Sequence, residues 1–315
     1  MKLLVTGCAG FIGANFTNYI LDRYPQDSIV GVDCLTYAAN SEALESLCRN
    51  ERFCFYKADI CDSAAMDEIF GSERPEVVVN FAAESHVDRS IIDASVFVRT
   101  NVFGTQVLLD TARRYGVQRF HQVSTDEVYG DMPLDSEIKF TEDSPLRPSS
   151  PYSASKAAAD LLVFSSQRTH GLPVSISRST NNYGKYQHVE KLIPMTVDSL
   201  LSGKPVPNHG DGKNMRDWLF VEDNCKAIDL IIREGKCEIY NVGADNLWRN
   251  IDLVRRIAEL IGDSNSQITF VPDRKGNDRK YAVSSAKLSA LGWKPKADFC
   301  IELKETLDWY KSKFV

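Results

Sequence analysis

The sequence lacks the features that would place the protein in a membrane or on nucleic acid. Its longest apolar stretches, such as 77–83, are strand-sized and far short of the about 20 apolar residues that a membrane-spanning helix needs. Its 37 Lys and Arg against 43 Asp and Glu give a net charge of −6, so no basic excess attracts phosphate backbones or anionic lipids. We therefore expect neither a nucleic-acid partner nor a membrane partner.

Metal-binding and secretion patterns are also missing. The chain has eight cysteines and five histidines, but no C-x-x-C pair and no histidine pair with the spacing of a zinc site, so we expect no metal. The apolar N-terminal run stops at Gly7 without the small-residue cleavage site of a secretory leader. A chain of 315 residues buries an adequate core without disulfides. These observations predict reduced, mostly buried thiols in a cytoplasmic protein.

Short apolar segments alternate with amphipathic ones through the first 180 residues. Strand character is found at 2–6, 29–32, 52–57, 76–81, 118–124 and 173–178, and helical periodicity at 11–24, 42–48, 63–70, 95–115 and 152–170. This alternation predicts an α/β fold, a Rossmann-type doubly wound parallel sheet with helices on both faces.

After residue 185 the pattern loosens and Pro and Gly become frequent. Strand-like segments at 217–221 and 238–242 flank a helix at 222–234 and are expected to rejoin the sheet, and helices at 250–262, 284–291 and 300–312 would form a smaller C-terminal α/β lobe. We expect residues 1–184, with a returning segment at about 215–245, to bind a dinucleotide. Residues 185–315 would mainly bind the substrate.

The first predicted strand runs into GCAGFIG, which places Gly7, Gly10 and Gly13 at a strand-to-helix turn. In such a turn the first glycine allows the bend, the second lets a pyrophosphate approach the backbone, and the third permits close helix–strand packing. Asp33 ends the second strand, 33 − 13 = 20 residues further on, where a carboxylate accepts from a ribose 2′-hydroxyl and repels a 2′-phosphate. No arginine adjoins it, so the sequence predicts NAD rather than NADP.

Tyr152 and Lys156 form the first candidate catalytic pair. They lie four residues apart in a segment of strong helix formers, so both side chains are expected on one helical face. An ammonium group beside a phenol lowers the phenol pKa from about 10 toward neutrality, which would make Tyr152 a usable base.

A second polar cluster, STDEVYG at 124–130, follows the predicted strand at 118–124. Its side chains are expected at the carboxyl ends of the sheet, where this fold binds ligands. Ser124 and Thr125 can hydrogen-bond a sugar hydroxyl and the tyrosine, and Asp126 and Glu127 supply two carboxyl groups that can act as one acid and one base. A solvated turn is the alternative interpretation of this acidic pair.

Together these segments resemble the extended short-chain dehydrogenases/reductases, and more narrowly the nucleotide-sugar 4,6-dehydratases. The likeness runs from residue 1 to about 310 and rests on AAESHVDRS (82–90), STDEVYG (124–130), YSASK (152–156), NNYG (181–184), EKLIP (190–194) and RDWLFVED (216–223). Sister 4-epimerases and decarboxylases do not carry the Asp–Glu pair. The resemblance implies a lyase of deoxysugar biosynthesis that uses NAD to convert a nucleotide-activated glucose to its 4-keto-6-deoxy form.

The resemblance also implies a role for each catalytic residue. Tyr152 would take the proton of the sugar 4-hydroxyl while hydride passes from carbon four to NAD. Glu127 would then remove the proton of carbon five and Asp126 would protonate the departing 6-hydroxyl, before the hydride returns to carbon six. Thr125 would hold the 4-oxygen, and Lys156 would also grip the nicotinamide ribose.

The remaining binding residues are carried over by position. The NAD site would comprise Gly7, Gly10, Phe11, Ile12, Gly13, Asp33, Cys34, Leu35, Thr36, Asp59, Ile60, Phe81, Ala82, Ala83, Ser85, Thr100, Tyr152, Lys156 and Asn182. The nucleotide-sugar site would comprise Ser85, Thr125, Asn181, Lys191, Leu192, Pro207, Asn208, His209, Arg216, Asn250, Asp273, Arg274, Lys275, Gly276 and Asn277. Two alternatives stay open, a helix-cap role for Asp59 and a surface position for Arg216. The family also implies a homodimer through the helices at 95–115 and 152–170, and the sequence alone leaves a monomer open.

Departures from the family pattern fall in the nucleotide pocket. They are Lys185 (usually Pro), His188 and Val189 (usually Phe and Pro), His209 (commonly an aromatic residue), and Lys275 and Asn277 (typically Pro and His). These changes leave the chemical residues intact and the base undecided, with dTDP-glucose favoured and UDP-glucose or another UDP sugar as the alternative. A sister epimerase or decarboxylase and a non-catalytic dinucleotide sensor are the other hypotheses.

Overall fold

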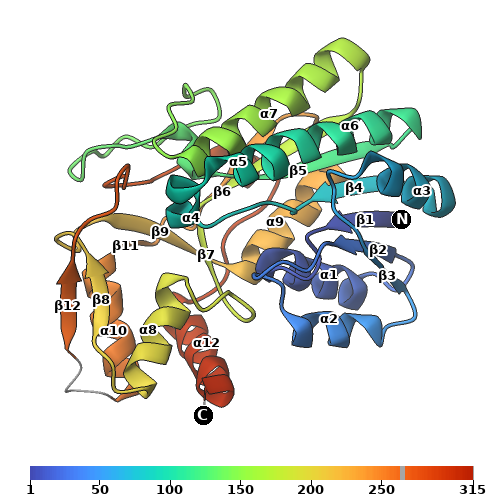
Figure 1. Ribbon diagram of the computed structural model, residues 1–315. Helices are drawn as coiled ribbons and strands as arrows, with labels where there is room; N and C mark the ends of the chain where they lie inside the picture. The colour runs from blue at the N-terminus through green and yellow to red at the C-terminus, as the bar shows by residue number, and fades with distance from the viewer. Residues whose placement is uncertain (263–266, 315) are drawn as a thin grey trace.

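A seven-stranded parallel sheet forms the centre of the computed structural model, which describes residues 1–262 and 267–314 (Figure 1). In the order β10-β6-β5-β4-β1-β2-β3, its strands are β1 (Lys2–Thr6), β2 (Ser28–Asp33), β3 (Phe53–Lys57), β4 (Val77–Asn80), β5 (Arg119–Thr125), β6 (Val174–Ser179) and β10 (Ile239–Val242). The chain direction across the sheet reverses between β1 and β4, and open α/β sheets bind ligands at such switch points. The predicted Rossmann-type fold is confirmed.

Helices cover both faces of this sheet (Figure 1). One face carries α1 (Phe11–Arg23), α2 (Ser41–Cys48) and α9 (Val221–Glu234), and the other carries α3 (Ser63–Glu73), α6 (Thr105–Arg114) and α7 (Pro151–His170). Neighbouring residues of one strand serve both cores: Leu3 packs with Phe16 of α1, whereas Leu4 packs with Leu108 of α6. Burial of both faces explains why the strands read as nearly continuous apolar runs.

The helix predicted at 95–115 is interrupted. After the short helices α4 (Val87–Ile92) and α5 (Ala94–Phe97), a π-helical segment, η1 (Val98–Gly104), precedes α6. Asn101 in η1 is buried, and its side chain bonds the backbone N–H and carbonyl of Glu84 (2.8 and 3.0 Å) and the Ser155 hydroxyl (2.8 Å). Segments of this kind recur at functional sites, and here η1 ties the end of β4 to α7.

The chain beyond residue 180 returns to the sheet only in part. β10 lies beside β6 as predicted, but the expectation that 217–221 also rejoins the sheet is wrong. β9 (Met215–Phe220) pairs with β7 (Asn181–Tyr183) and β11 (Leu247–Arg249) in a separate three-stranded sheet. Both edges of β6 are already occupied by β5 and β10, so no place beside it remains.

A smaller group of elements lies below one end of the sheet in Figure 1. It contains α8 (Leu192–Leu201), β8 (Val206–His209), α10 (Asn250–Ile261), β12 (Ile268–Val271) and α12 (Phe299–Phe314), around a core that includes Val197, Leu253 and Leu307. The helix α11 (Ala286–Ala290) does not belong to this core, contrary to the expectation for 284–291. Its Leu288 packs with Tyr240 of β10, because the chain crosses back over the edge of the main sheet.

The cysteines differ from the expected burial. All eight are free, but Cys34, Cys48, Cys54 and Cys300 are exposed, so the prediction of mostly buried thiols is wrong. Half of them lie in surface positions where neither a disulfide nor a core requires them. Over 1–262 and 267–314, none of the helices combines the length and the apolar character that crossing a membrane requires.

Candidate active site

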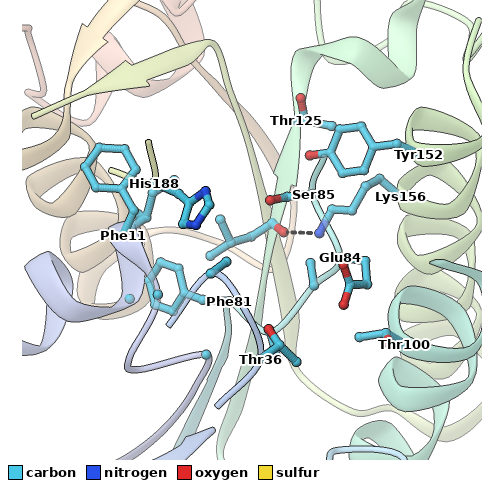
Figure 2. Close-up of a pocket in the computed structure, with 18 of the residues that line it drawn as sticks. Phe11, Thr36, Phe81, Glu84, Ser85, Thr100, Thr125, Tyr152, Lys156 and His188 are labelled. Atoms are coloured by element: carbon cyan, nitrogen blue, oxygen red, sulfur yellow. Dashed lines mark hydrogen bonds between the residues drawn. The ribbon is translucent and has the colours of Figure 1, made fainter. Parts of the chain in front are cut away.

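A cavity of about 470 Å³ opens at the carboxyl ends of the central strands, at the switch point (Figure 2). Its wall contains all five predicted catalytic residues and most of the predicted NAD residues. The predicted residues that line it are Gly7, Gly10, Phe11, Ile12, Gly13, Asp33, Cys34, Thr36, Asp59, Ile60, Phe81, Ala82, Ala83, Ser85, Thr100, Thr125, Asp126, Glu127, Tyr152, Lys156, Asn181, Asn182 and Lys191. Leu35 is not part of the wall. Its N–H instead donates to Asp33 Oδ1 (2.8 Å).

The glycine turn is shaped for a dinucleotide. Gly7 has a φ of +66°, and a Cβ there would lie 2.7 Å from the backbone nitrogen of Ala82. A Cβ on Gly13 would lie 2.2 Å from the carbonyl oxygen of Gly7, so α1 packs against the turn at backbone distance. No side chain caps the first turn of α1. Its free N–H groups therefore face the cavity as an anion site, which fits the pyrophosphate of NAD.

Asp33 is held in place by two backbone donors. Its Oδ2 accepts from Ala9 N–H (3.0 Å) and its Oδ1 from Leu35 N–H (2.8 Å). Burial raises the pKa of this carboxyl, and these two hydrogen bonds oppose the rise. Asp59 does not cap α3, whose cap is Asp62; it accepts from Cys61 N–H instead. The residues present therefore fit a ribose with a free 2′-hydroxyl.

Replacing Asp33 with asparagine should weaken the choice of NAD over NADP. The shape is kept but the charge that repels a 2′-phosphate is lost, so the ratio of the NADP and NAD dissociation constants should fall about tenfold or more. Calorimetric titration with each dinucleotide measures this ratio. Asp62→Asn, at the cap of α3, is the control and should leave the ratio unchanged. An unaltered ratio in Asp33→Asn would contradict the assignment.

Local sequence rules place the predicted catalytic residues on two elements. β5 ends at Thr125, whose hydroxyl accepts from Glu127 N–H (3.2 Å) and so starts the 3-10 turn η2 (Asp126–Tyr129). A capping box at Ser150 and a proline at the first helical position start α7 just before Tyr152. Figure 2 shows the Tyr152 phenol beside Thr125, with Lys156 on the same side of the cavity.

The two neighbouring carboxyl groups have different surroundings. Asp126 is 2% exposed, and burial together with the charges of Glu127 and Asp217 raises its pKa well above the usual range. Burial also raises the pKa of Glu127, but the cations Arg216 and Lys191 oppose that rise. Asp126 therefore holds its proton more firmly than Glu127, and such a separation of pKa values allows one carboxyl group to act as an acid and the other as a base.

Tyr152 does not have the lowered pKa that its spacing from Lys156 predicts. Burial and the Glu127 charge raise its pKa, while the Thr125 hydroxyl lowers it. Lys156 donates to the carbonyl oxygen of Val123 (2.7 Å) rather than to the phenol, as the dashed line in Figure 2 marks. Burial lowers the pKa of Lys156 to about 8, so it is mostly a cation at neutral pH.

Basic side chains flank the carboxyl pair. Lys191 donates to the carbonyl oxygen of Ser85 (3.0 Å), and Arg216 is buried and bonds Asn277 Oδ1 (3.2 Å) and the carbonyl oxygen of Asp278 (2.8 Å). Arg216 is therefore not a surface charge. Its positive charge lowers the pKa of Glu127, and its hydrogen bonds join β9 to the 273–281 segment.

The other predicted substrate residues lie outside the cavity wall, in the smaller group of elements. They are Leu192 at the start of α8, Pro207, Asn208 and His209 on β8, Asn250 at the start of α10, and Asp273, Arg274, Lys275, Gly276 and Asn277 after β12. His209 Nδ1 lies 3.3 Å from the carbonyl oxygen of Pro272, and the Asn277 amide donates to Asp273 (2.6 Å). β8 and the 273–277 segment thus adjoin each other.

Several cavity residues were not predicted from sequence. Arg99, Thr180 and Gln187 all line the wall. Thr180 directly follows β6, so the rule that ligands bind at strand ends would have found it. Arg99 lies in η1 and Gln187 in the irregular 185–191 segment, and only the folded chain brings these two to the cavity.

The likeness to known proteins extends along the whole chain. The family model described as GDP-mannose 4,6 dehydratase matches residues 4–306. dTDP-glucose 4,6-dehydratase 1 of Escherichia coli (strain K12) is 46% identical over 337 residues, which cover 99% of this chain and 93% of that protein. DesIV (dTDP-glucose 4,6-dehydratase) from Streptomyces venezuelae, solved with NAD and TYD bound, superposes with a TM-score of 0.95 at 44% identity, covering 99% of this chain and 97% of that one.

A sister activity shares the fold at lower identity. UDP-glucose 4-epimerase from Thermotoga maritima, solved with UDP-glucose, has a TM-score of 0.92 at 29% identity and covers 100% of both chains. The architecture alone therefore does not separate the two activities, whereas the dehydratases share many more residues with this chain. The chain belongs to the nucleotide-sugar 4,6-dehydratase family of the extended short-chain dehydrogenases/reductases.

Proposed function

We propose that the protein removes one water from a glucose carried on a nucleoside diphosphate, dTDP-glucose in the first place, and forms the 4-keto-6-deoxy sugar. The observation that carries this proposal is the pair Asp126 and Glu127, two adjacent carboxyl groups with different surroundings, in one cavity with Tyr152 and Lys156. NAD, when bound, supplies a reversible acceptor for the two electrons of carbon four, which return to the same sugar at carbon six.

Each side chain then has one proton to hold or move. Tyr152 must be a phenolate for its step, against the burial that raises its pKa, and it then takes the proton of the 4-hydroxyl. Thr125 holds the 4-oxygen, and the positive charge of Lys156 favours the phenolate. Glu127 removes the proton of carbon five, which the new ketone has acidified. Asp126 gives its proton to the 6-hydroxyl, which leaves as water, and Glu127 returns a proton to carbon five. The proton held by Tyr152 finally restores Asp126, so the sugar loses one water in total.

The proposed division of labour follows the two parts of the chain. Residues 1–184, with the returning segment, hold the dinucleotide, and residues 185–315 mainly bind the nucleotide. Lys191, Arg216 and Arg274 are suited to the diphosphate because cations pair with its oxygens, and guanidinium groups do so in a forked geometry. The acidic chain thus concentrates cations beside the carboxyl pair, where all three act on Glu127. His209 and the 273–277 segment would meet the base.

Mass spectrometry of nucleotide-sugar mixtures tests the function. Incubation with dTDP-glucose, UDP-glucose and GDP-mannose should show loss of one water, fastest from dTDP-glucose. Faster loss from UDP-glucose would move the assignment to that base. An unchanged mass with an altered sugar configuration would indicate an epimerase instead. Loss of carbon dioxide from UDP-glucuronate would indicate a decarboxylase, and inertness toward every sugar a dinucleotide sensor.

We also propose that the protein works in the cytoplasm as a homodimer. The support for the homodimer is an apolar face on α4, η1 and α7, where Ile92, Phe103 and Leu161 are 86%, 54% and 63% exposed. A groove lined by Val98, Val102, Phe103 and Leu162 runs along the same helices. A second copy packing its own α7 on this face would bury it.

A charge on this face should separate the subunits. Leu161→Glu should raise the dimer dissociation constant about 30-fold or more, the effect of losing a buried contact worth about 2 kcal/mol. Sedimentation over a range of concentrations measures it. Ile301→Glu, at an apolar position of α12 that is 59% exposed, is the control and should not change the association. A wild-type protein that sediments as a monomer would refute the dimer.

A further inference from the structure

A third polar residue continues the catalytic face of α7. Tyr152, Lys156 and Asp160 are spaced at i, i+4 and i+8, so their side chains lie along one side of the helix. Asp160 is 0% exposed and does not line the cavity, and no step of the proposed reaction uses it. A fully buried carboxylate one turn from the catalytic lysine therefore needs its own explanation.

Asp160 forms a buried ion pair with Arg178. Its Oδ2 accepts from Arg178 Nε (2.9 Å), and Arg178 is itself only 2% exposed. Arg178 is fixed in turn, because its Nη1 donates to the Tyr129 hydroxyl (3.0 Å) and its guanidinium lies 4.9 Å from the centre of that ring. The Tyr129 hydroxyl donates to Asn241 Oδ1 (2.7 Å), so β6, η2 and β10 together hold the arginine.

Only Oδ2 of the two Asp160 carboxylate oxygens accepts a hydrogen bond from Arg178. Within the described residues, Asp160 Oδ1 has no partner at hydrogen-bond distance, although Asp160 is completely buried. The Ser124 hydroxyl, which is also without a partner at that distance, acts on this carboxyl as a donor and lowers its pKa. A structural ion pair is usually made with both oxygens satisfied, and a forked arginine contact is the common way to do so. Here Arg178 bonds a single oxygen and uses another nitrogen for Tyr129, so part of the negative charge stays available to the neighbouring turn of α7.

We propose that Asp160 is a positioning residue for catalysis, whose buried carboxylate keeps Lys156 in its charged form so that Lys156 can stabilise the ionised Tyr152. The Lys156 ammonium group has no direct carboxylate contact among the described ion pairs and hydrogen-bonds only the carbonyl oxygen of Val123. The negative charge of Asp160, one turn further along α7, then stabilises the buried Lys156 cation without direct contact. Asp160, with Arg178 behind it, thus acts on the pair Tyr152 and Lys156 from outside the cavity.

The other charged groups around Lys156 do not replace this support. Asp126 and Glu127 on η2, and also Glu84 and Lys191, line the same cavity as Lys156. Tyr152 shares its helix, and Arg178 lies on β6. Burial lowers the pKa of Lys156, and Asp160 raises it. The Asp160 charge acts on Tyr152 as well and raises the pKa of that phenol, though less than burial and Glu127 do. Lys156 in turn lowers the pKa of Asp160, together with Arg178, while burial raises it. The two α7 residues thus stabilise each other's charged forms.

Asp160→Asn tests the proposal because it keeps the shape and removes the charge. The titration of Lys156 should move to lower pH by about one to two units, the usual effect of one close opposite charge. The side-chain carbon resonance of Lys156 in ¹³C-lysine-labelled protein, assigned by its absence in Lys156→Arg, measures this without substrate or turnover. The alkaline limb of the rate profile for water loss should move down by the same amount, since Lys156 acts as a cation.

Variants of the partner residue separate this role from a structural one. Asp160→Asn leaves Arg178 as a buried unpaired cation and is expected to lower thermal stability. The double variant Asp160→Asn, Arg178→Met removes both charges, so stability should recover while the Lys156 titration stays shifted. Asp160→Glu should restore part of the wild-type titration.

An unshifted Lys156 titration in both Asp160→Asn and the double variant would overturn the proposal and leave Asp160 as a partner of Arg178 only. The kinetic arm rests on the proposed function, but the resonance titration does not. A protein that fails to dehydrate any nucleotide sugar and still shows the shift would therefore refute the function and retain the role of Asp160.

Discussion

Glu127→Gln should reduce the rate of water loss by about 10²- to 10⁴-fold, the range expected when a general base is removed. The amide is nearly isosteric and cannot accept the proton of carbon five. Asp126 cannot replace it, because burial and neighbouring negative charges raise the pKa of Asp126 and keep it protonated. Mass spectrometry of the sugar product over time gives the rate directly.

Two further variants locate the effect. Asp126→Asn should also slow the loss of water, because it removes the proton that the 6-hydroxyl needs to leave. Glu302→Gln is the matched control: burial raises the pKa of Glu302 too, but it lies on α12 away from the cavity, and wild-type rates are expected. A Glu127→Gln protein that loses water as fast as the wild type would exclude Glu127 as the base.

Gly13→Ala should cost the protein about 2 kcal/mol or more of its free energy of unfolding, a typical loss when a well-packed contact is overfilled. The added methyl carbon would lie 2.2 Å from the carbonyl oxygen of Gly7, and backbone atoms cannot rotate away. Helix α1 must therefore move off the turn, and the N–H groups of its first turn move with it. Affinity for NAD should fall in the same protein.

The control for this substitution is another glycine within a helix. Gly71 lies in α3, and a Cβ there would come 3.3 Å from the Tyr115 hydroxyl, the far end of a side chain that can shift. Gly71→Ala should be neutral or stabilising, since alanine favours a helix by about 1 kcal/mol over glycine. Chemical denaturation and calorimetric NAD titration of both variants give the comparison. Equal stability and equal affinity in the two variants would show that the Gly13 contact does not matter.

The central fold was predictable because its signals are local. Apolar runs bounded by polar turns identify the strands, and buried faces identify α1 and α7 within a few residues. Predictions failed where packing between distant segments decides strand pairing or helix type. β9 has strand character but pairs with β7 and β11, and the helix at 95–115 contains a π-helical segment. Neither outcome has a signature in the spacing of the residues concerned.

The candidate site likewise has features that the sequence predicts and features that depend on the folded chain. The sequence by itself determined the glycine turn, Asp33 and the four-residue spacing of Tyr152 and Lys156, because each follows from backbone geometry within one or two adjacent elements. Only the tertiary structure decided how the pKa values are shifted. A pKa depends on burial and on charges that come from elsewhere in the chain, such as Arg216 beside Glu127 and Asp160 near Lys156, and these shift the pKa values of the two carboxyl groups to different extents and oppose the lowering of the Lys156 pKa by burial.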